Sequence, residues 1–506
     1  MRHVLILGDQ LTTDHGPLAD ADPGSTVVVT IESVELVRAT RAHTQKAALF
    51  FGALRQFSRD LASRGFQVDH HRTADSFASA IGEHLRRWPG VTLELMRPAD
   101  RGVAEALTLA ARRAGGDVRL LPNPLRLVPD EAFDDYARGR KRWRMEDFYR
   151  RARAREGWLM DPDDPTQPLG GVWNLDRENR RVPPAGTRFP PPPVFEPDDL
   201  MRDVLDDVER LFPDHPGQLR PFDWPTTRAE ALAALADFVD HRLPAFGPYE
   251  DAMVGGERVL HHSQLSVPLN LGLLHPREVV EAVLRAFHAG DGRVPLASAE
   301  GFVRQVLGWR EFVYHVDRTR GPALEAANAL KHHAAVPDAF WTGRTRMACL
   351  ADAWQGLHER GWNHHIERLM LFGNLALTLG TDPRALTAWF TAHYVDALDW
   401  VMVPNVMGMS QYADDGGFTS KPYASGGAYV SRMSDHCRRC PFEPGRRTGP
   451  DACPFTVGYW GFIDRHQARF ERHPRMAMAV RSWRARPAAE QAAVRERAAE
   501  LRDALP

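Results

Sequence analysis

The sequence predicts two structural classes in one chain: an α/β domain with a parallel sheet, followed by a large all-α domain. The first 130 residues alternate short apolar runs with helical segments, and this alternation is typical of a parallel sheet covered by helices. From about residue 228 onward apolar residues recur at helical spacing, and no convincing run of alternating strands interrupts them. We therefore expect domains at residues 1–130 and 231–506, joined by a long connector at 131–230.

Five short apolar segments near the N-terminus are predicted to be buried strands. Between them, residues 44–65 are apolar at helix spacing and closed by Gly65, which predicts a helix. The expected fold is Rossmann-like, but Gly8-Asp9-Gln10 follows the first strand, so the dinucleotide fingerprint Gly-x-Gly-x-x-Gly is absent. The predicted strands are HVLILG (3–8), TVVVTI (26–31), FQVDHH (66–71), VTLELM (91–96) and DVRLLP (117–122).

The connector is polar and rich in proline, including FPPPPVFEP at 189–197, so we expect only a few helices packed over the surface. Residues 138–155 hold nine basic and two acidic residues with aromatic side chains interleaved. A solvated helical face and a phosphate-contacting surface both explain this segment. The net charge of −2 does not by itself indicate a nucleic-acid partner.

The opening apolar run, Val4 to Leu7, is too short for a signal peptide, and no stretch approaches the length of a membrane span. We therefore expect a cytoplasmic protein with no membrane partner. The cytoplasm keeps thiols reduced, so the four cysteines are expected to be metal ligands rather than disulfides.

Three of those cysteines lie in the single stretch HCRRCPFEPGRRTGPDACPF, and the fourth, Cys349, lies far upstream. Cys440 and Cys453 each precede a proline, as at the end of bacterial ferredoxin cluster runs. The spacing favours an iron–sulfur cluster that joins two helical segments. Zinc, with His436 as a substitute ligand, and free thiols are the alternatives.

Several stretches, in order along nearly the whole chain, resemble the photolyase–cryptochrome superfamily, and in particular its prokaryotic iron–sulfur (6-4) photolyases and bacterial cryptochromes. The resemblance implies a monomeric DNA repair lyase that uses FAD and light on (6-4) pyrimidine photoproducts in UV-damaged DNA, and that is nucleoid-associated when bound. It also implies a [4Fe–4S] cluster on Cys349, Cys437, Cys440 and Cys453. The matching stretches include ILGDQL (6–11), GGVWNLDRENRR (170–181), SQLSVPLNLGLL (263–274), VLGWREFVYH (306–315), WNHHIERLMLFGN (362–374), VDALDWVMVPNVMGMSQYADDG (395–416) and SKPYASGGAYVSRMSDHC (420–437).

The resemblance places FAD in the all-α domain. HHSQLS (261–266) resembles the family's phosphate turn with His262 in place of a threonine, although a plain helix cap also explains its serines. Arg368 and Asp399 match an ion pair beside the isoalloxazine ring, where a buried positive charge favours the reduced flavin anion. Gln305 matches (6-4) enzymes rather than cyclobutane-dimer enzymes. The implied FAD set is Tyr249, His262, Ser263, Gln264, Leu265, Ser266, Gln305, Trp309, Arg310, Arg368, Asp396, Asp399 and Asn405, the last facing flavin N5.

Repair of a (6-4) lesion needs a proton donor as well as an electron, because a hydroxyl moves between bases. WNHHIERL resembles the family's (6-4) motif and implies His365 as that donor, oriented by His364, with Tyr423 contributing. A purely structural histidine pair is the alternative. Met409 and Lys421 resemble substrate-pocket residues.

The N-terminal domain is implied to hold a light-harvesting chromophore, 6,7-dimethyl-8-ribityllumazine. A glycine at the carboxyl end of a strand lets a planar ring approach the backbone. Trp341 and Trp389 match electron-relay positions, but Phe390 stands where a redox-active tyrosine would be expected. The implied lumazine contacts are Gly8, Asp9, Gln10, Ile31 and Glu35.

Two other classes of function stay open at this point. Phe390, and Leu369 where animal (6-4) enzymes carry a histidine, leave room for a cryptochrome-like blue-light photoreceptor without repair activity. His365, Gln305 and the basic connector favour repair. A zinc-stabilised nucleic-acid-binding protein without chromophores is the third possibility.

Overall fold

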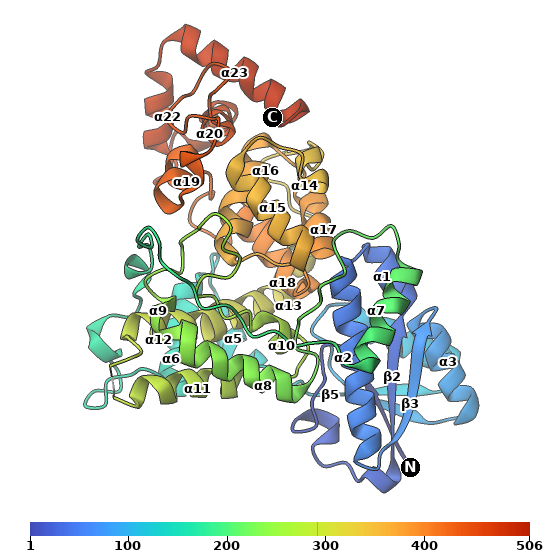
Figure 1. The fold of residues 1–506 in the computed structure, drawn as a ribbon. Helices are drawn as coiled ribbons and strands as arrows, with labels where there is room; N and C mark the ends of the chain where they lie inside the picture. The colour runs from blue at the N-terminus through green and yellow to red at the C-terminus, as the bar shows by residue number, and fades with distance from the viewer. Residues whose placement is uncertain (291) are drawn as a thin grey trace.

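Five parallel strands form the N-terminal sheet in a computed structural model that describes residues 1–290 and 292–506 (Figure 1). The strand order is β3-β2-β1-β4-β5, so the chain starts in the middle of the sheet and winds outward in both directions. All five predicted strands are confirmed. They are β1 (Arg2–Ile6), β2 (Thr26–Ser33), β3 (Gln67–Ala74), β4 (Thr92–Met96) and β5 (Asp117–Leu121).

Helices cover both faces of this sheet. The predicted helix at 44–65 is confirmed as α2 (Thr44–Ser63), while α3 (Phe77–Arg87) and α4 (Val103–Arg113) cover the opposite face. Because alternate side chains of a strand point to opposite faces, Val4 and Ile6 pack in the core with α2, whereas Leu5 packs under α3 and α4.

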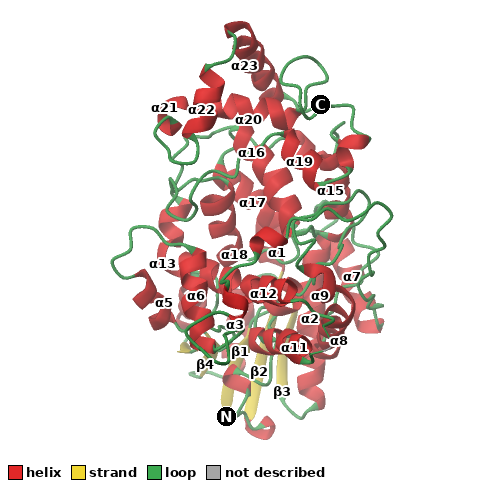
Figure 2. Cartoon of the chain, turned by 90° about the vertical axis from the view of Figure 1, so that its left-hand side faces the viewer, coloured by secondary structure: helices red, strands yellow, loops and turns green. Residues whose placement is uncertain are grey.

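The rest of the described chain is helical, as the sequence predicts. Figure 2 shows the strands at one end of the molecule and the C-terminal helices α22 and α23 at the other. The other α-helices are α1 (Val34–Thr40), α5 (Asp130–Ala137), α6 (Met145–Glu156), α7 (Asp199–Leu211), α8 (Arg228–Asp237), α9 (Leu243–Phe246), α10 (Ser266–Asn270), α11 (Pro276–His288), α12 (Leu296–Val303), α13 (Glu311–Glu325), α14 (Asp338–Thr342), α15 (Ala348–Arg360), α16 (Asn374–Leu379), α17 (Pro383–His393), α18 (Asp399–Val403), α19 (Gly427–Met433), α20 (Pro454–Arg465), α21 (Gln467–Phe470), α22 (Ala477–Arg484) and α23 (Ala488–Asp503).

The remaining helical elements are short 3₁₀ and π-helical turns. Three of the wider, π-helical turns continue directly into or out of α-helices and carry residues of the candidate flavin site. The π turns are η5 (Phe238–Arg242), η6 (Arg304–Arg310), η7 (Glu367–Gly373) and η8 (Pro404–Ser410), and the 3₁₀ turns are η1 (Gly16–Leu18), η2 (Pro23–Ser25), η3 (Leu169–Gly171), η4 (Asp176–Glu178) and η9 (His436–Arg438).

The connector packs on both domains. Its helix α6 lies against η6 of the helical domain, and α7 lies against α2 of the sheet domain. The buried Arg55 of α2 ties α7 to the sheet, because it pairs with Glu32 at 2.6 Å and with Asp207 of α7 at 2.7 Å. The boundaries at residues 130 and 230 stay a prediction.

The aromatic residues of the basic segment 138–155 belong to the core. Trp143, Phe148 and Tyr149 are buried, and Phe148 packs edge-on to Phe133 of α5. The exposed side chains of the segment are mainly cationic, although Asp147 is exposed as well and Arg153 is buried, so any DNA contact by this segment rests on charge rather than on base stacking. Among the described helices, none is long and apolar enough to cross a membrane.

Candidate flavin, repair and metal sites

Three π-helical turns carry many of the residues predicted to contact FAD. A π turn inserts one residue into an α-helix and widens it locally, and such turns are frequent at functional sites. Helix propensity along the sequence gives no sign of them. Gln305, Trp309 and Arg310 lie in η6, Arg368 lies in η7, and Asn405 and the predicted substrate residue Met409 lie in η8.

Arg368 pairs with Asp396 and not with Asp399, so the predicted Arg368–Asp399 pair is wrong. The guanidinium donates to both carboxylate oxygens of Asp396, at 2.8 and 3.0 Å, a bidentate geometry of high strength. Ser266 Oγ donates to the same carboxylate at 2.7 Å. The reason is positional: Asp396 lies in the loop before α18, whereas Asp399 begins that helix and is directed toward the sheet domain.

Asp399 instead belongs to a charged cluster at the interface between the domains. Burial raises the pKa of the Asp399 carboxyl, and the positive charge of Lys46 of α2 opposes this rise. Burial and the neighbouring Asp399 raise the pKa of Asp100 to about 7, and burial lowers the pKa of Lys46 to about 8. Asp100 accepts a hydrogen bond from the backbone N–H of Trp400 at 2.8 Å, which ties the loop after β4 to α18.

The predicted phosphate turn at 261–266 offers donors without partners. Gln264 has a left-handed backbone with φ of 58°, and its buried Nε2 has no hydrogen-bond partner. Ser263 Oγ accepts from the N–H of Leu265 at 3.2 Å, while the Leu265 side chain lies in the core. Tyr249 stacks on His261 with ring centroids 5.7 Å apart. Unpaired buried donors beside the Arg368–Asp396 pair fit a phosphate-bearing ligand such as FAD.

Gln305 and its neighbours form a buried polar network. Gln305 Nε2 donates to Glu250 Oε1 at 2.5 Å, Asn179 donates to the other oxygen of Glu250, and Arg304 Nη2 lies 3.6 Å from that oxygen. Burial raises the pKa of Glu250. Asn405 Nδ2 donates to the carbonyl of Val401 at 2.9 Å, which leaves its side-chain oxygen available.

Trp309 and Arg310 diverge from one another. The Trp309 ring packs near Phe418, with centroids 6.2 Å apart. Arg310 is directed toward the end of the sheet domain, where its Nη1 donates to the carbonyl of Leu125 at 3.4 Å. Its guanidinium also lies 5.4 Å from the centre of the Trp400 ring of α18. Burial and the neighbouring Arg126 lower the pKa of Arg310 to about 9.

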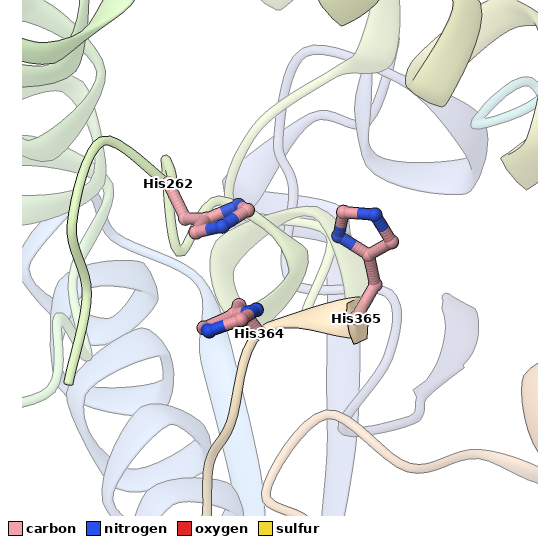
Figure 3. Close-up of side chains that lie close together, drawn as sticks. All are labelled: His262, His364 and His365. Carbon is pink, nitrogen blue, oxygen red and sulfur yellow. The ribbon is translucent and has the colours of Figure 1, made fainter. Parts of the chain in front are cut away.

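Three histidines meet in the helical domain (Figure 3). The rings of His262 and His364 are stacked, with centroids 4.6 Å apart and an interplanar angle of 7°, and His365 stands edge-on to His262 at 5.6 Å. Burial lowers the pKa of His262 and of His364 well below its ordinary value, so both rings are neutral. His365 is 45% exposed and its Nε2 lies 3.6 Å from Asp251. Of the three rings, only that of His365 is open to solvent.

Of the other predicted repair residues, Tyr423 lies in the electrostatic surroundings of Asp251, and Lys421 lies in those of Arg180, which pairs with Asp251 at 3.4 Å. Burial raises the pKa of Tyr423, and Asp176 and Asp251 act in the same direction. Burial, Arg475 and Arg180 lower the pKa of Lys421. Sequence reasoning missed Glu250, Asp251 and Asp176. Glu250 and Asp251 directly follow Tyr249, and this pair of adjacent carboxylates beside a proposed flavin contact was the available signal.

A row of aromatic rings leads from the surface toward Arg368. The 51%-exposed Trp341 contacts His393 edge-on at 5.4 Å, and His393 stacks on the buried Trp389 at 4.7 Å. Trp389 lies 6.2 Å from the Tyr394 ring, over which Arg368 sits at 4.2 Å. The structure thus brings Trp341 and Trp389 together and adds Tyr394, which sequence reasoning missed.

The four cysteines line one cavity. Cys349 lies in the first turn of α15, Cys437 in η9, and Cys453 immediately before α20, so the distant thiol joins the other three. Burial and the neighbouring thiols raise the pKa of Cys349 far above its ordinary value, and burial raises the pKa of Cys453 to about 11. A metal or cluster is what stabilises several buried thiolates together, and four cysteines fit [4Fe–4S]. His436 lines the same cavity with an unpaired buried Nε2.

The predicted lumazine contacts follow or end the neighbouring strands β1 and β2. A Cβ on Gly8 would meet Phe50 of α2 at 2.8 Å, and Gln10 Nε2 donates to the carbonyl of Met96 at 2.9 Å. Burial raises the pKa of Asp9 to about 6. Ile31, in contrast, packs in the core under α3 and α4, and Glu35 is exposed on α1. The assignment of Gly8, Asp9, Gln10, Ile31 and Glu35 to an antenna chromophore stays a prediction.

Comparison with known proteins adds independent findings. Residues 4–224 match the model of the family described as deoxyribodipyrimidine photo-lyase-related protein. A (6-4) photolyase from Agrobacterium fabrum is 38% identical over 485 residues, which cover 95% of each chain.

Solved structures share the fold. A bacterial class III photolyase from Agrobacterium tumefaciens matches with a TM-score of 0.56 at 18% identity, covering 95% of this chain and 98% of its own. A cryptochrome from Synechocystis sp. PCC6803 matches with a TM-score of 0.57 at 18% identity, covering 88% and 90%. With its parallel sheet, its helical domain and a relative this similar along its whole length, the chain belongs to the (6-4) photolyases of the photolyase–cryptochrome superfamily.

Proposed function

We propose that this protein is a light-dependent (6-4) photolyase, which repairs the (6-4) pyrimidine photoproduct in UV-damaged DNA as a monomer in the bacterial cytoplasm. The observation that carries the proposal is the exposure of His365. It is the one member of the histidine group that reaches solvent, and it lies 3.6 Å from the carboxylate of Asp251.

FAD is the proposed cofactor, held by residues 261–266, the Arg368–Asp396 pair and the polar side chains of η6 and η8. When bound in its reduced form and excited by light, it supplies an electron to the lesion. The paired guanidinium of Arg368 places a fixed positive charge in this pocket, which favours an anionic ligand beside it. Asp396 is fixed in turn by Arg368, Ser266 and Asn270, so the charge pair does not need to reorganise.

His365 holds the proton that the lesion requires. The Asp251 carboxylate lies 3.6 Å from its Nε2, and donation of a proton from the ring to the moving hydroxyl group assists the transfer of that group between the bases. His364 and His262, neutral and buried, fix the position of the neighbouring ring by packing. A flipped-out lesion is the expected substrate, because a damaged and poorly stacked base costs the least to extrude.

Two further groups belong to the proposal. The four cysteines hold a [4Fe–4S] cluster, which joins α15 to α20. Gly8, Asp9, Gln10, Ile31 and Glu35 are the proposed contacts of a 6,7-dimethyl-8-ribityllumazine antenna in the sheet domain.

The test is illumination of the purified, reduced protein with an oligonucleotide that carries one (6-4) photoproduct. Restored pyrimidines, separated by chromatography, are expected under blue light and not in the dark. Normal reduction of the flavin by light, without any restored pyrimidine, would replace this function with that of a cryptochrome-like photoreceptor. The observation that favours this second candidate is Phe390, which stands where a redox-active tyrosine would be expected.

A further inference from the structure

Three histidines and an aspartate meet on one face of the N-terminal sheet, apart from the flavin, repair and cysteine sites. Asp69 and His71 are alternate residues of β3 and therefore point to the same face. His84 comes from α3, which packs against β2 and β3 (Figure 1), and His3 comes from the start of β1. All four residues are more than nine-tenths buried.

One carboxylate oxygen of this group faces two imidazole nitrogens. Asp69 Oδ2 lies 2.6 Å from His84 Nδ1 and 3.2 Å from His71 Nε2. The three ligand atoms all lie within 4.8 Å of one another. A tetrahedral zinc ion with bonds of about 2.0–2.1 Å holds its ligand atoms about 3.3 Å apart. Shifts of about 1 Å or less at the side chains would let the three atoms share one ion.

The atoms of these groups that face away from the shared point have partners of their own. Outer partners of this kind orient metal-binding imidazoles and carboxylates and raise metal affinity. Arg87 Nη1 donates to Asp69 Oδ1 at 2.6 Å, His3 Nδ1 lies 3.0 Å from His84 Nε2, and Glu83 Oε2 lies 3.7 Å from His71 Nδ1.

We infer that Asp69, His71 and His84 bind a divalent transition-metal ion, with Zn²⁺ as the ion that the ligands fit best. Two imidazoles and one carboxylate form a ligand set that zinc accepts, with water in the fourth position. The side chains of Asp69 and His71 keep 9% and 7% of their surface exposed, which gives the ion a route from solvent. The ion cross-links the edge strand β3, which pairs only with β2 in the described sheet, to the helix that covers it.

Hydrogen bonds alone would also satisfy these four side chains, with His84 bridging Asp69 and His3. The two arrangements differ in the amount of zinc that the protein binds. The near-isosteric variants Asp69→Asn and His71→Gln remove one ligand each with little change in volume. His333→Gln is the matched control, because its side chain is 75% exposed and lies in the helical domain.

The experiment measures zinc in the full-length holoprotein after equilibration with Zn²⁺ and a competing chelator. Wild type and His333→Gln are expected to retain one zinc per chain more than the two ligand variants, whose affinity falls at least about 100-fold. Any zinc bound by the cysteines is the same in all these proteins, so it does not affect the difference in zinc content between them. Crystals of the wild type grown with Zn²⁺ are expected to show an anomalous zinc peak between Asp69, His71 and His84.

Equal zinc content in wild type and in a folded ligand variant would overturn the inference. An anomalous peak confined to the cysteines or to the His262 group would overturn it as well. Circular dichroism and flavin content establish that each variant is folded. If one variant does not fold, the other variant and the anomalous map of the wild type decide the outcome.

Discussion

His365 differs from the two histidines beside it by its exposure, and this difference divides their roles. His262 and His364 are buried and neutral, so they pack, whereas His365 reaches solvent and lies near Asp251. A proton donor must reach the substrate, and of the three rings only that of His365 is exposed. In the proposed function, the stack of the two buried rings fixes the site and the exposed ring is the proton donor.

The variant His365→Asn tests this division. It keeps a polar side chain of similar size but cannot carry a proton, so we expect repair of the (6-4) lesion to slow by at least about 100-fold. Flavin content and affinity for damaged DNA are expected to stay within about two-fold of wild type, given the position of His365 at the edge of the buried group. His241→Asn, at a 62%-exposed histidine of η5, is the control. Repair by His365→Asn at nearly the wild-type rate would refute the assignment.

Tyr394 has the contacts expected of an electron relay that Phe390 cannot provide. Its hydroxyl donates to Asn363 Oδ1 at 2.9 Å, and its ring lies between Trp389 and Arg368. The variant Tyr394→Phe removes the hydroxyl with its hydrogen bond and makes the ring harder to oxidise. We expect slower reduction of the flavin by light, measured by absorbance with an external reductant, and an unchanged rate in Tyr459→Phe. An unchanged rate in Tyr394→Phe would leave the tryptophans as the complete relay.

The ion-pair partner of Arg368 could not be predicted from the sequence. The sequence offers two carboxylates, Asp396 and Asp399, only three residues apart, and both suit an ion pair. The beginning of α18 separates them: the residue in the loop faces Arg368, and the residue in the first helical turn faces Lys46. Chemistry could therefore be predicted from residue type, but the partner depended on where a helix starts.

At the scale of elements, the cysteine site joins α15 to η9 and α20. A metal or cluster bound there should stabilise the packing of these segments. The variant Cys349→Ser removes the ligand on α15, so we expect loss of bound iron, loss of the visible absorbance of a cluster and a lower unfolding temperature. Iron analysis and thermal unfolding measure both effects. Full retention of iron would show that Cys349 is not a ligand.

His436→Gln separates the two candidate metals. A cluster on four cysteines keeps its iron in this variant, whereas a zinc site that uses His436 loses metal. The buried, unpaired Nε2 of His436 is what makes the comparison informative.

Elements with a clear apolar period could be predicted, and elements shaped by tertiary packing could not. The five strands and α2 follow from local patterns alone. The π turns η6, η7 and η8 leave no such pattern, because the extra residue in each is stabilised by packing and polar contacts from other segments. The same holds for the connector, whose α6 and α7 pack on different domains.

For the whole molecule, the charged interface between the domains predicts how stability changes with pH. The pKa of Asp100 is raised from 3.8 to about 7, so between these values the folded protein binds more protons than the unfolded chain. Stability therefore falls as pH rises from about 4 to about 7. Asp9, with a pKa of about 6, acts in the same direction.

Asp100→Asn removes most of this dependence and should stabilise the protein at pH 8. Because Asp100 keeps partial contact with solvent, we expect a gain of about 2 kcal/mol or less. Unfolding temperatures at pH 5 and pH 8 test the prediction, with Asp338→Asn on α14 as the control at an ordinary helix start. A steeper decline of stability with pH in the variant than in wild type would contradict the expected sign.

DNA binding by the whole molecule should depend on salt, since the basic segment contributes charge and not stacking. Arg142 is exposed in the loop that leads to Trp143, and the N–H of Trp143 donates to Gly417 at 3.3 Å, four residues before Lys421. The exposed cations therefore adjoin the proposed substrate pocket.

If the protein makes 6–10 phosphate contacts, its affinity for lesion-bearing duplex falls about 10³–10⁵-fold between 50 and 200 mM salt. Arg142→Ala is expected to lower the slope of log K against log salt by about 1, while Arg113→Ala on α4 leaves it unchanged. Titrations at several salt concentrations measure these slopes, and an affinity independent of salt would remove phosphate contacts from the account of how this molecule finds damaged DNA.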